Sequence, residues 1–384
     1  MYYYKRILLA ALLAVVSCPL NASIFSVEAR SLGMGNARVA TADIATAPFA
    51  NPGMLSFQRS REDFALLVGL GAFLNDNDNV VDKIDEFQTA YNNGQAGNPD
   101  EALRALDIAQ SMLGDVIAPE TTLLFSTGFS GKQWAFAVSG RADAIAAGTV
   151  KTADVNDPAQ YDLVIEGILT SELGASIARN FRAYGYKMAL GVTPKYVKVD
   201  SVYYAESLTT VDSGFNDLLR DENTRDLGDY TTFDVGFVMG LTKHMQIGLV
   251  ATNLVSHKIN FVNSAGDPAT LSFDKQLRLG FAYRTNMFTF GADLDLIESD
   301  ALLTSADFQA LKEQNLSLGG EFNLLDFMQL RIGAQKNLAD GISDAAKDNL
   351  YTAGVGFWFG FNLDLALVTQ NDSLGAFLQT GFRF

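Results

Sequence analysis

Hydrophobic and polar residues alternate with a period of two over most of the chain after residue 64. The segment 361–367 has the sequence FNLDLAL, and the segment 288–296 has the sequence FTFGADLDL. Successive side chains of a β-strand point to opposite faces, so each segment has one apolar face and one polar or small face. The pattern therefore predicts an all-β protein made of antiparallel strands.

Fourteen segments of this kind are expected. They lie near 64–73, 121–129, 133–147, 161–179, 187–204, 229–241, 245–262, 273–284, 287–297, 316–323, 328–336, 349–359, 361–370 and 375–384. Most exceed the usual strand length of about 5 to 6 residues, whereas a tilted strand that crosses a membrane needs about 9 to 11. The lengths and the even count predict a transmembrane antiparallel β-barrel of about 14 strands, in preference to a soluble sandwich.

Seven charged residues on the polar faces of these segments are candidates to line the lumen. They are Asp234, Arg278, Arg284, Asp293, Asp295, Arg331 and Asp364. Charges in the middle of a strand are tolerated where they face a wet barrel interior. They can take part in the passage of small molecules, or they can form ion pairs that only solvate the interior. The sequence leaves both interpretations open.

The links between the segments provide a second test of the barrel. From the second strand on, short links at 130–133, 242–244, 285–286, 324–327 and 360 alternate with longer polar ones, of which 371–374 is a short exception. Short periplasmic turns that alternate with long extracellular loops are typical of outer-membrane barrels. The alternation predicts that both termini lie in the periplasm.

Two helices are expected in the longest loop, at Val80 to Ala90 and at Asp100 to Leu113. The second follows Asn98-Pro99 and has acidic residues in its first turn, as helix N-termini commonly do. These helices are interpreted as a cap on the barrel rim. The alternative is a lid over a groove for a hydrophobic ligand.

The N-terminus has the features of a secretory signal peptide. Lys5 and Arg6 precede an apolar run of ten residues at 7–16, which is too short to span a bilayer. Residues 1–22 are therefore expected to be removed after Ala22. The alternative is a lipoprotein signal, in which Cys18 would carry a lipid.

At the C-terminus, Leu378, Thr380, Phe382 and Phe384 alternate down to a terminal phenylalanine. Outer-membrane barrels present such a last strand to the barrel insertion machinery. The expected location is therefore the bacterial outer membrane, with its lipids and this machinery as partners.

The composition excludes several other classes. The net charge of −16 would repel nucleic acid. The single cysteine lies in the export segment, so neither a disulfide nor a cysteine-ligated zinc site is expected in the mature chain. The sequence predicts no metal and no cofactor.

A motif rich in small residues precedes the first strand. Residues 30–43 have the sequence RSLGMGNARVATAD, and FANPGML follows at 49–55. The motif resembles the N-terminal signature of barrels related to the outer-membrane long-chain fatty-acid transporter (FadL-like), and most of all the TraF-type conjugal transfer family. In these barrels the segment forms a plug in the lumen. The resemblance implies a plug at 23–60 and a barrel at 61–384.

Five residues are expected to shape this plug. Gly33 and Gly35 let its backbone pack closely against the wall. Asn51, Pro52 and Gly53 are expected to fix a turn where the chain leaves the lumen for the first strand. Gly53 departs mildly from the family pattern, which has alanine there.

Three classes of function are compatible with such a barrel. The first is a plugged passive transporter of small or hydrophobic molecules, and the second is a structural or assembly barrel of conjugation or secretion machinery. An outer-membrane enzyme is the third, but it would need a histidine base beside a serine or an acid. His244 falls in a predicted turn and His257 next to Ser256, whose side chain would face the opposite way on a strand. No catalytic residue is predicted.

Overall fold

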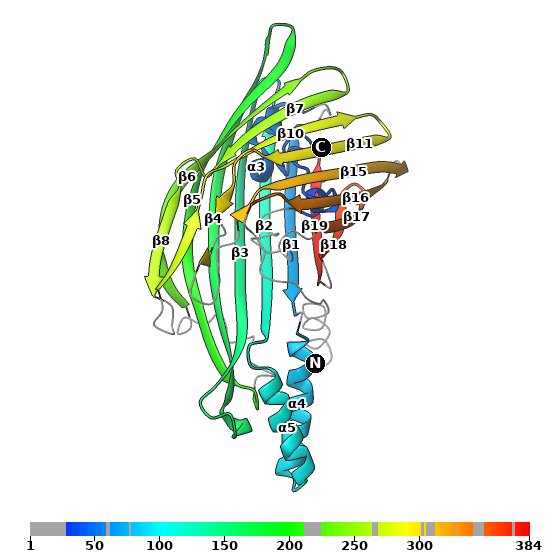
Figure 1. The fold of residues 1–384 in the computed structure, drawn as a ribbon. Coiled ribbons are helices and arrows are strands. Elements are labelled where there is room, and N and C mark those ends of the chain that lie inside the picture. Colours follow the sequence, from blue (N-terminus) through cyan, green and yellow to red (C-terminus); the bar gives the residue numbers. More distant parts are fainter. Residues whose placement is uncertain are drawn as a thin grey trace.

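Fourteen antiparallel strands close into a barrel (Figure 1). The computed structural model describes residues 28–58, 62–76, 78–210, 224–262, 268–300, 303–304, 312–325, 327–340, 349–370 and 373–384. The sheet closes where the first strand pairs with the last, from Ala65 opposite Arg383 to Leu74 opposite Leu374. This confirms the predicted fold class. The expected signal peptide and Cys18 lie outside the described residues.

The barrel strands follow the predicted segments closely. They are β1 Phe64–Asn75, β2 Val116–Ser130, β3 Trp134–Thr152, β4 Tyr161–Ala183, β5 Tyr186–Ser207, β6 Thr224–Gly240, β7 Met245–Thr252, β10 Gln276–Arg284, β11 Phe288–Asp295, β15 Asn315–Leu325, β16 Met328–Asn337, β17 Leu350–Trp358, β18 Asn362–Gln370 and β19 Ser373–Arg383. The remaining elements are α2 Ala29–Gly33, α3 Ala47–Ala50, η1 Pro52–Ser56, α4 Val80–Gln95, α5 Pro99–Ser111, η2 Pro158–Gln160, β8 His257–Val262, β9 Pro268–Phe273, β12 Ser299–Asp300, β13 Leu303–Thr304 and β14 Lys312–Glu313.

The period of two in the sequence becomes a difference between the two faces of the wall. On β1, Leu66, Val68 and Leu70 point outward and are exposed, whereas Ala65 and Leu67 are buried in the interior. Other strands repeat this, and Ile332 in the middle of β16 is 71% exposed. An apolar exterior of this extent would be unstable in water and is stable against lipid. The chain is therefore an outer-membrane barrel.

Aromatic rings gather at the end of the barrel that holds the C-terminus. The ring of Phe384 stacks on that of Phe64 at 5.7 Å, and Phe357 stacks on Phe359 at 5.8 Å. Aromatic girdles of this kind lie at the membrane interface of outer-membrane barrels. The backbone N–H of Phe384 also donates to the carbonyl of Phe64 at 3.0 Å, so the last residue helps to close the wall.

One predicted strand is wrong. The segment 245–262 alternates throughout, yet β7 ends at Thr252, and β8 pairs with β9 in a small separate sheet. The break occurs at Asn253, whose φ of 51° is left-handed and cannot continue a strand. Its backbone N–H donates to the carboxylate of Asp234 at 2.9 Å, which fixes the turn. The next barrel strand consequently starts at Gln276, because Phe273 belongs to β9.

The two predicted loop helices are present as α4 and α5. Asn98 caps α5 by accepting from the backbone N–H of Asp100 at 3.2 Å. The hairpin projects beyond the barrel end opposite the C-terminus (Figure 1). Its base joins a buried cluster that includes Phe87 and Met112 of the hairpin with Tyr161 and Leu163 of β4. No helix in the described part of the chain combines the length and apolarity that a transmembrane helix needs.

Candidate functional site

Residues 28–58 lie inside the barrel, and we name this segment the plug. Almost every residue from Glu28 to Phe57 is buried. Helix α2 packs against β16 to β19, and η1 packs against β2 to β6 on the other side. Between them, Val39 lies against β7 and β10. The plug therefore contacts strands around the whole circumference of the lumen.

Glycines in the wall make this close packing possible. We name seven of them the glycine belt: Gly191, Gly236, Gly248, Gly280, Gly291, Gly319 and Gly333. They pair in register across neighbouring strands, as Gly191 with Gly236 and Gly291 with Gly319 show. A Cβ on any of them would overlap plug atoms, for example the Met34 carbonyl at Gly319. The belt is a strip of the wall without side chains, and the plug packs closely against it.

Two glycines of the plug meet the wall from the other side. A Cβ on Gly35 would lie 2.5 Å from the backbone nitrogen of Ala334, and its φ of +61° also favours glycine. A Cβ on Gly33 would lie 3.2 Å from the Cα of Gly354, a tighter contact than usual. The sequence motif thus marks a close approach of two backbones. Gly35 tolerates a side chain less well than Gly33 does.

Asn51, Pro52 and Gly53 lie deeper in the lumen than the sequence suggested. Asn51 Oδ1 accepts from the Gly53 backbone N–H at 3.0 Å and caps η1. Asn51 Nδ2 donates to the carbonyls of Val39 at 3.0 Å and Phe237 at 3.3 Å. The motif therefore ties the last part of the plug to its middle at Val39 and joins it to β6. The chain leaves the lumen only after η1.

A buried ion network holds α2 to the wall. Glu321 of β15 accepts from Arg30 Nε at 2.9 Å and Nη2 at 3.0 Å, and from Arg331 Nε at 2.9 Å. Arg331 continues to Asp364 at 2.6 Å, and Gln379 donates to Asp364 at 3.1 Å. Carboxylates and guanidinium groups alternate, so each buried charge has a partner of opposite sign. The network draws side chains from four strands, β15, β16, β18 and β19, and fixes the start of the plug.

Further polar contacts hold the middle of the plug. Asp293 Oδ2 accepts from the backbone N–H groups of Arg38 at 2.6 Å and Val39 at 2.8 Å. Arg284 donates to the carbonyl of Thr41 at 2.8 Å. Buried backbone groups need such partners. All seven charged residues predicted from the sequence face the interior. Arg284, Asp293, Arg331 and Asp364 contact the plug or its ion network.

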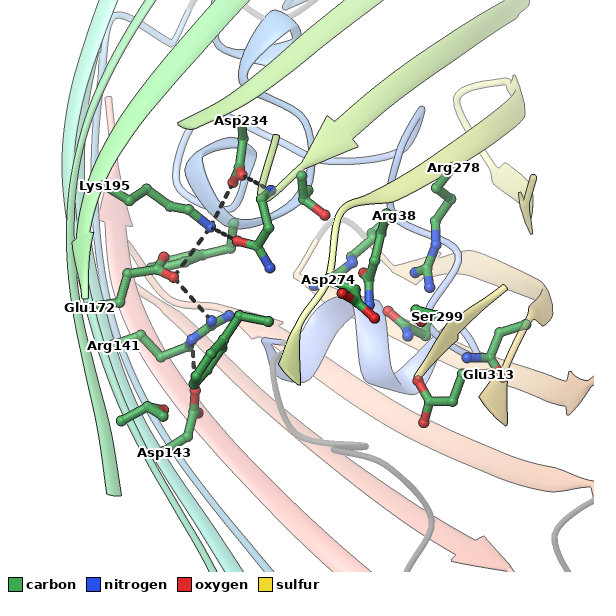
Figure 2. A pocket seen from close by; sticks show the side chains of 18 of the residues that line it. Arg38, Arg141, Asp143, Glu172, Lys195, Asp234, Asp274, Arg278, Ser299 and Glu313 are labelled. Atoms are coloured by element: carbon green, nitrogen blue, oxygen red, sulfur yellow. Dashed lines mark hydrogen bonds and ion pairs between the residues drawn. The ribbon is translucent and has the colours of Figure 1, made fainter. Parts of the chain in front are cut away.

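The remaining space of the lumen includes a cavity of about 180 Å³. Its lining includes Asn36 and Arg38 of the plug, charged residues of the wall, and Phe273 of β9. Figure 2 shows Asp234, Lys195, Glu172, Arg141 and Asp143 along one side, and Arg38, Asp274, Arg278, Ser299 and Glu313 on the other. The cavity is polar on both sides.

One side of the cavity is a ladder of alternating charges. Arg141 Nε lies 2.8 Å from Asp143, and its Nη2 lies 3.3 Å from Glu172. Lys195 Nζ lies 3.3 Å from Glu172 and 3.1 Å from Asp234. The other side is built around Arg278, which binds Asp295 through Nε at 2.5 Å and Nη2 at 3.0 Å.

Glu313 adds a carboxyl on the same side of the cavity as Arg278. It belongs to β14, a short strand that is not part of the barrel sheet. Burial, together with repulsion from Asp295, raises the pKa of Glu313 to about 7. Its carboxyl therefore takes up or loses a proton near neutral pH. The charge of this side of the cavity depends on pH for that reason.

The hairpin of β8 and β9 packs against strands β4, β5 and β6 of the wall next to the cavity. Leu271 and Phe273 of β9 form a buried cluster with Val197 and Val199 of β5. Tyr230 of β6 belongs to the same cluster, and His257 stacks on its ring at 4.6 Å. His244 lies in the β6–β7 turn, where Nδ1 is 2.9 Å from the carbonyl oxygen of Arg284. Both histidines thus have structural contacts. Within the described ranges, no three metal-ligating side chains cluster as a metal site would require.

Sequence reasoning missed Glu172, Lys195 and Glu321, although each stands on the inner face of its strand. The signal was available, because Glu321 shares the inward parity of Asn315, Ser317 and Gly319. The glycine belt had no such signal, because only the strand register shows that its members lie side by side.

Comparisons with known proteins agree with this architecture. The family model described as "F plasmid transfer operon, TraF, protein" matches residues 48–295, well over half of the chain. A mutant of the TodX monoaromatic hydrocarbon channel is 11% identical, with a TM-score of 0.55 over 94% of this chain and 100% of that one. No curated protein matches the sequence.

Two further solved structures are similar. A Pseudomonas aeruginosa FadL homologue is 13% identical, with a TM-score of 0.53 over 92% of this chain and 97% of that one. The Pseudomonas putida toluene transporter TodX is 13% identical, with a TM-score of 0.50 over 96% of this chain and 97% of that one. At these identities the likeness shows a shared barrel fold.

Proposed function

We propose that this chain, which belongs to the TraF family of F plasmid transfer operon proteins, is a passive outer-membrane channel closed by its own N-terminal segment. The observation that carries the proposal is the plug itself. Residues 28–58 contact the wall on all sides of the lumen, and polar contacts make up much of their attachment. A segment held in this way can be displaced while the barrel remains closed on itself.

Two features support passage rather than a purely structural filling. A cavity of about 180 Å³ remains between the plug and the far part of the wall, and charged side chains line it. Solved barrels of the same fold are described as a hydrocarbon channel and a toluene transporter. A barrel with a purely structural role needs no such cavity, because side chains can fill its interior throughout.

The experiment that tests the proposal removes residues 31–50. The fourteen strands and their pairings lie outside this range, so the barrel should still form and keep its heat-modifiable mobility in detergent gels. We expect its ion conductance in planar bilayers to rise well above that of the intact protein. The matched control removes residues 99–111, the projecting helix α5, which is a loop deletion of similar kind outside the lumen.

Equal conductance of the 31–50 deletion and the intact protein would contradict the channel proposal. The second candidate function, an assembly role in conjugal transfer, would then be favoured. The family match supports it, and the projecting hairpin of α4 and α5 offers a contact surface outside the membrane. The insertion machinery and a hydrophobic ligand stay predictions from the sequence.

A further inference from the structure

One side chain that lines the cavity beside the plug holds a buried hydrogen-bond donor with no acceptor among the described residues. Arg278 uses Nε and Nη2 on Asp295, at 2.5 and 3.0 Å. Its Nη1 is buried and has no partner among the described residues. The residue is only 8% exposed and lines the cavity. A buried donor of a charged group without a partner is unfavourable, so this position is suited to an acceptor from a ligand.

The plug contributes an acceptor to the same cavity. The side-chain nitrogen of Asn36 donates to Gln335 at 3.1 Å, while its Oδ1 is buried and has no partner within the described part of the chain. Asn36 also lines the cavity. Among the described residues, the wall thus contributes a buried donor and the plug a buried acceptor that have no partner, and both side chains line the cavity. A hydrocarbon could satisfy neither of them.

The ladder on the opposite side favours a cation. It contains three carboxylates, of Asp143, Glu172 and Asp234, but only two basic groups, of Arg141 and Lys195. With all five groups ionised, the ladder carries one net negative charge. An ammonium group near it would be stabilised, whereas an anion would be repelled.

The cavity volume limits the size of an occupant. A volume of about 180 Å³ has room for several water molecules. Pockets for drug-sized ligands are larger, at about 300–1,000 Å³. The space suits a solute of a few heavy atoms.

We propose that this cavity binds a small zwitterion of amino-acid size. Its carboxylate faces Arg278, and its ammonium group faces the ladder of Asp143, Glu172 and Asp234. This assignment rests on the proposed channel function, because it names the class of solute that would pass. Guanidinium and carboxylate groups form strong charge-assisted hydrogen bonds. The carboxylate of the ligand is therefore assigned to Arg278. Asn36 makes the plug part of the site, so displacement of the plug would open it.

Equilibrium dialysis of the full-length protein in detergent tests the assignment. The probes are radiolabelled alanine, then acetate and ethylammonium as its two halves, and toluene as an apolar contrast. We expect saturable binding of alanine, affinities roughly tenfold or more weaker for each half, and no saturable binding of toluene. Binding of toluene without alanine would overturn the proposal and favour an apolar cargo.

A variant and its control make the test specific. The double variant Arg278→Gln and Asp295→Asn removes the guanidinium and also neutralises Asp295, the carboxylate that it binds. The amide oxygen introduced by the second substitution can still accept from the backbone N–H of Asn315, as Asp295 does at 2.8 Å. We expect alanine affinity to fall roughly tenfold or more. The control, Lys198→Gln with Asp200→Asn, neutralises an ion pair of β5 that does not line the cavity. It should bind alanine as the parent does.

Heat-modifiable gel mobility shows whether each variant is folded. Unchanged alanine affinity in a folded cavity variant would overturn the assignment. Conductance of the 31–50 deletion separates this inference from the channel proposal. If that deletion conducts but the intact protein does not bind alanine, only the zwitterion assignment fails. If alanine binds but the deletion does not conduct, the channel proposal fails and the binding site stands.

Discussion

Gly319→Val is expected to raise the open probability of the barrel in planar bilayers by roughly 5- to 150-fold. Gly319 lies in the glycine belt, and a Cβ there would overlap the carbonyl group of Met34. The plug backbone must move away, since the strand is held by pairing on both sides. Overpacking of this kind typically destabilises by about 1–3 kcal/mol, which corresponds to that range in an equilibrium constant.

The adjacent glycine supplies the matched control. Gly320 points to the outer face, where a Cβ would lie 3.3 Å from the flexible ring of Phe288 and far from the plug. Gly320→Val should leave the open probability close to that of the parent. If both variants behave alike, strand distortion and not plug displacement is the cause, and the belt has no role in closing the lumen.

Glu321→Ala is expected to lower the free energy of unfolding by about 3–5 kcal/mol, because it leaves buried guanidinium groups without their carboxylate. Arg30 would lose both of its bonds to Glu321, and Arg331 would keep only Asp364. The start of the plug should then detach. Unfolding in guanidinium chloride measures the first effect, and amide hydrogen exchange at residues 29–39 measures the second.

Two further variants test whether the unpaired guanidinium groups cause the loss of stability in Glu321→Ala. Glu298→Ala breaks an exposed ion pair with Lys312 and should leave the free energy of unfolding nearly unchanged. Arg30→Met combined with Glu321→Leu replaces charges by apolar groups of similar size and should recover most of the lost stability. Absence of any recovery would mean that Glu321 acts through the barrel wall alone.

The barrel could be predicted from the sequence because alternation is a local property of each strand. Lipid outside and a polar lumen inside force it on every one of them, as in FNLDLAL at 361–367. The break after Thr252 could not be predicted, because β8 continues the alternating pattern of β7. Only the left-handed Asn253 and its bond to Asp234 separate the two.

The site was predictable only in part, for a related reason. Asp293, Arg331 and Asp364 could be assigned to the lumen from their parity alone. Their partners depend on strand register and on the path of the plug, which joins Arg30 to Glu321 across 291 positions of sequence. The same holds for Gly319 and Gly333, which are neighbours only after β15 and β16 have paired.

A disulfide that can be formed and reduced between the plug and the wall tests whether displacement of the plug opens the channel. A Cβ at position 128 would lie 2.8 Å from Ile44 Cγ2, so Ile44→Cys and Gly128→Cys lie within disulfide reach, which needs Cβ atoms about 3.5–4.5 Å apart. Cys18→Ser in the same chain removes its only native cysteine. We expect that oxidised channels stay closed in a planar bilayer and that the same channels open after reduction. Equal opening before and after reduction would contradict it.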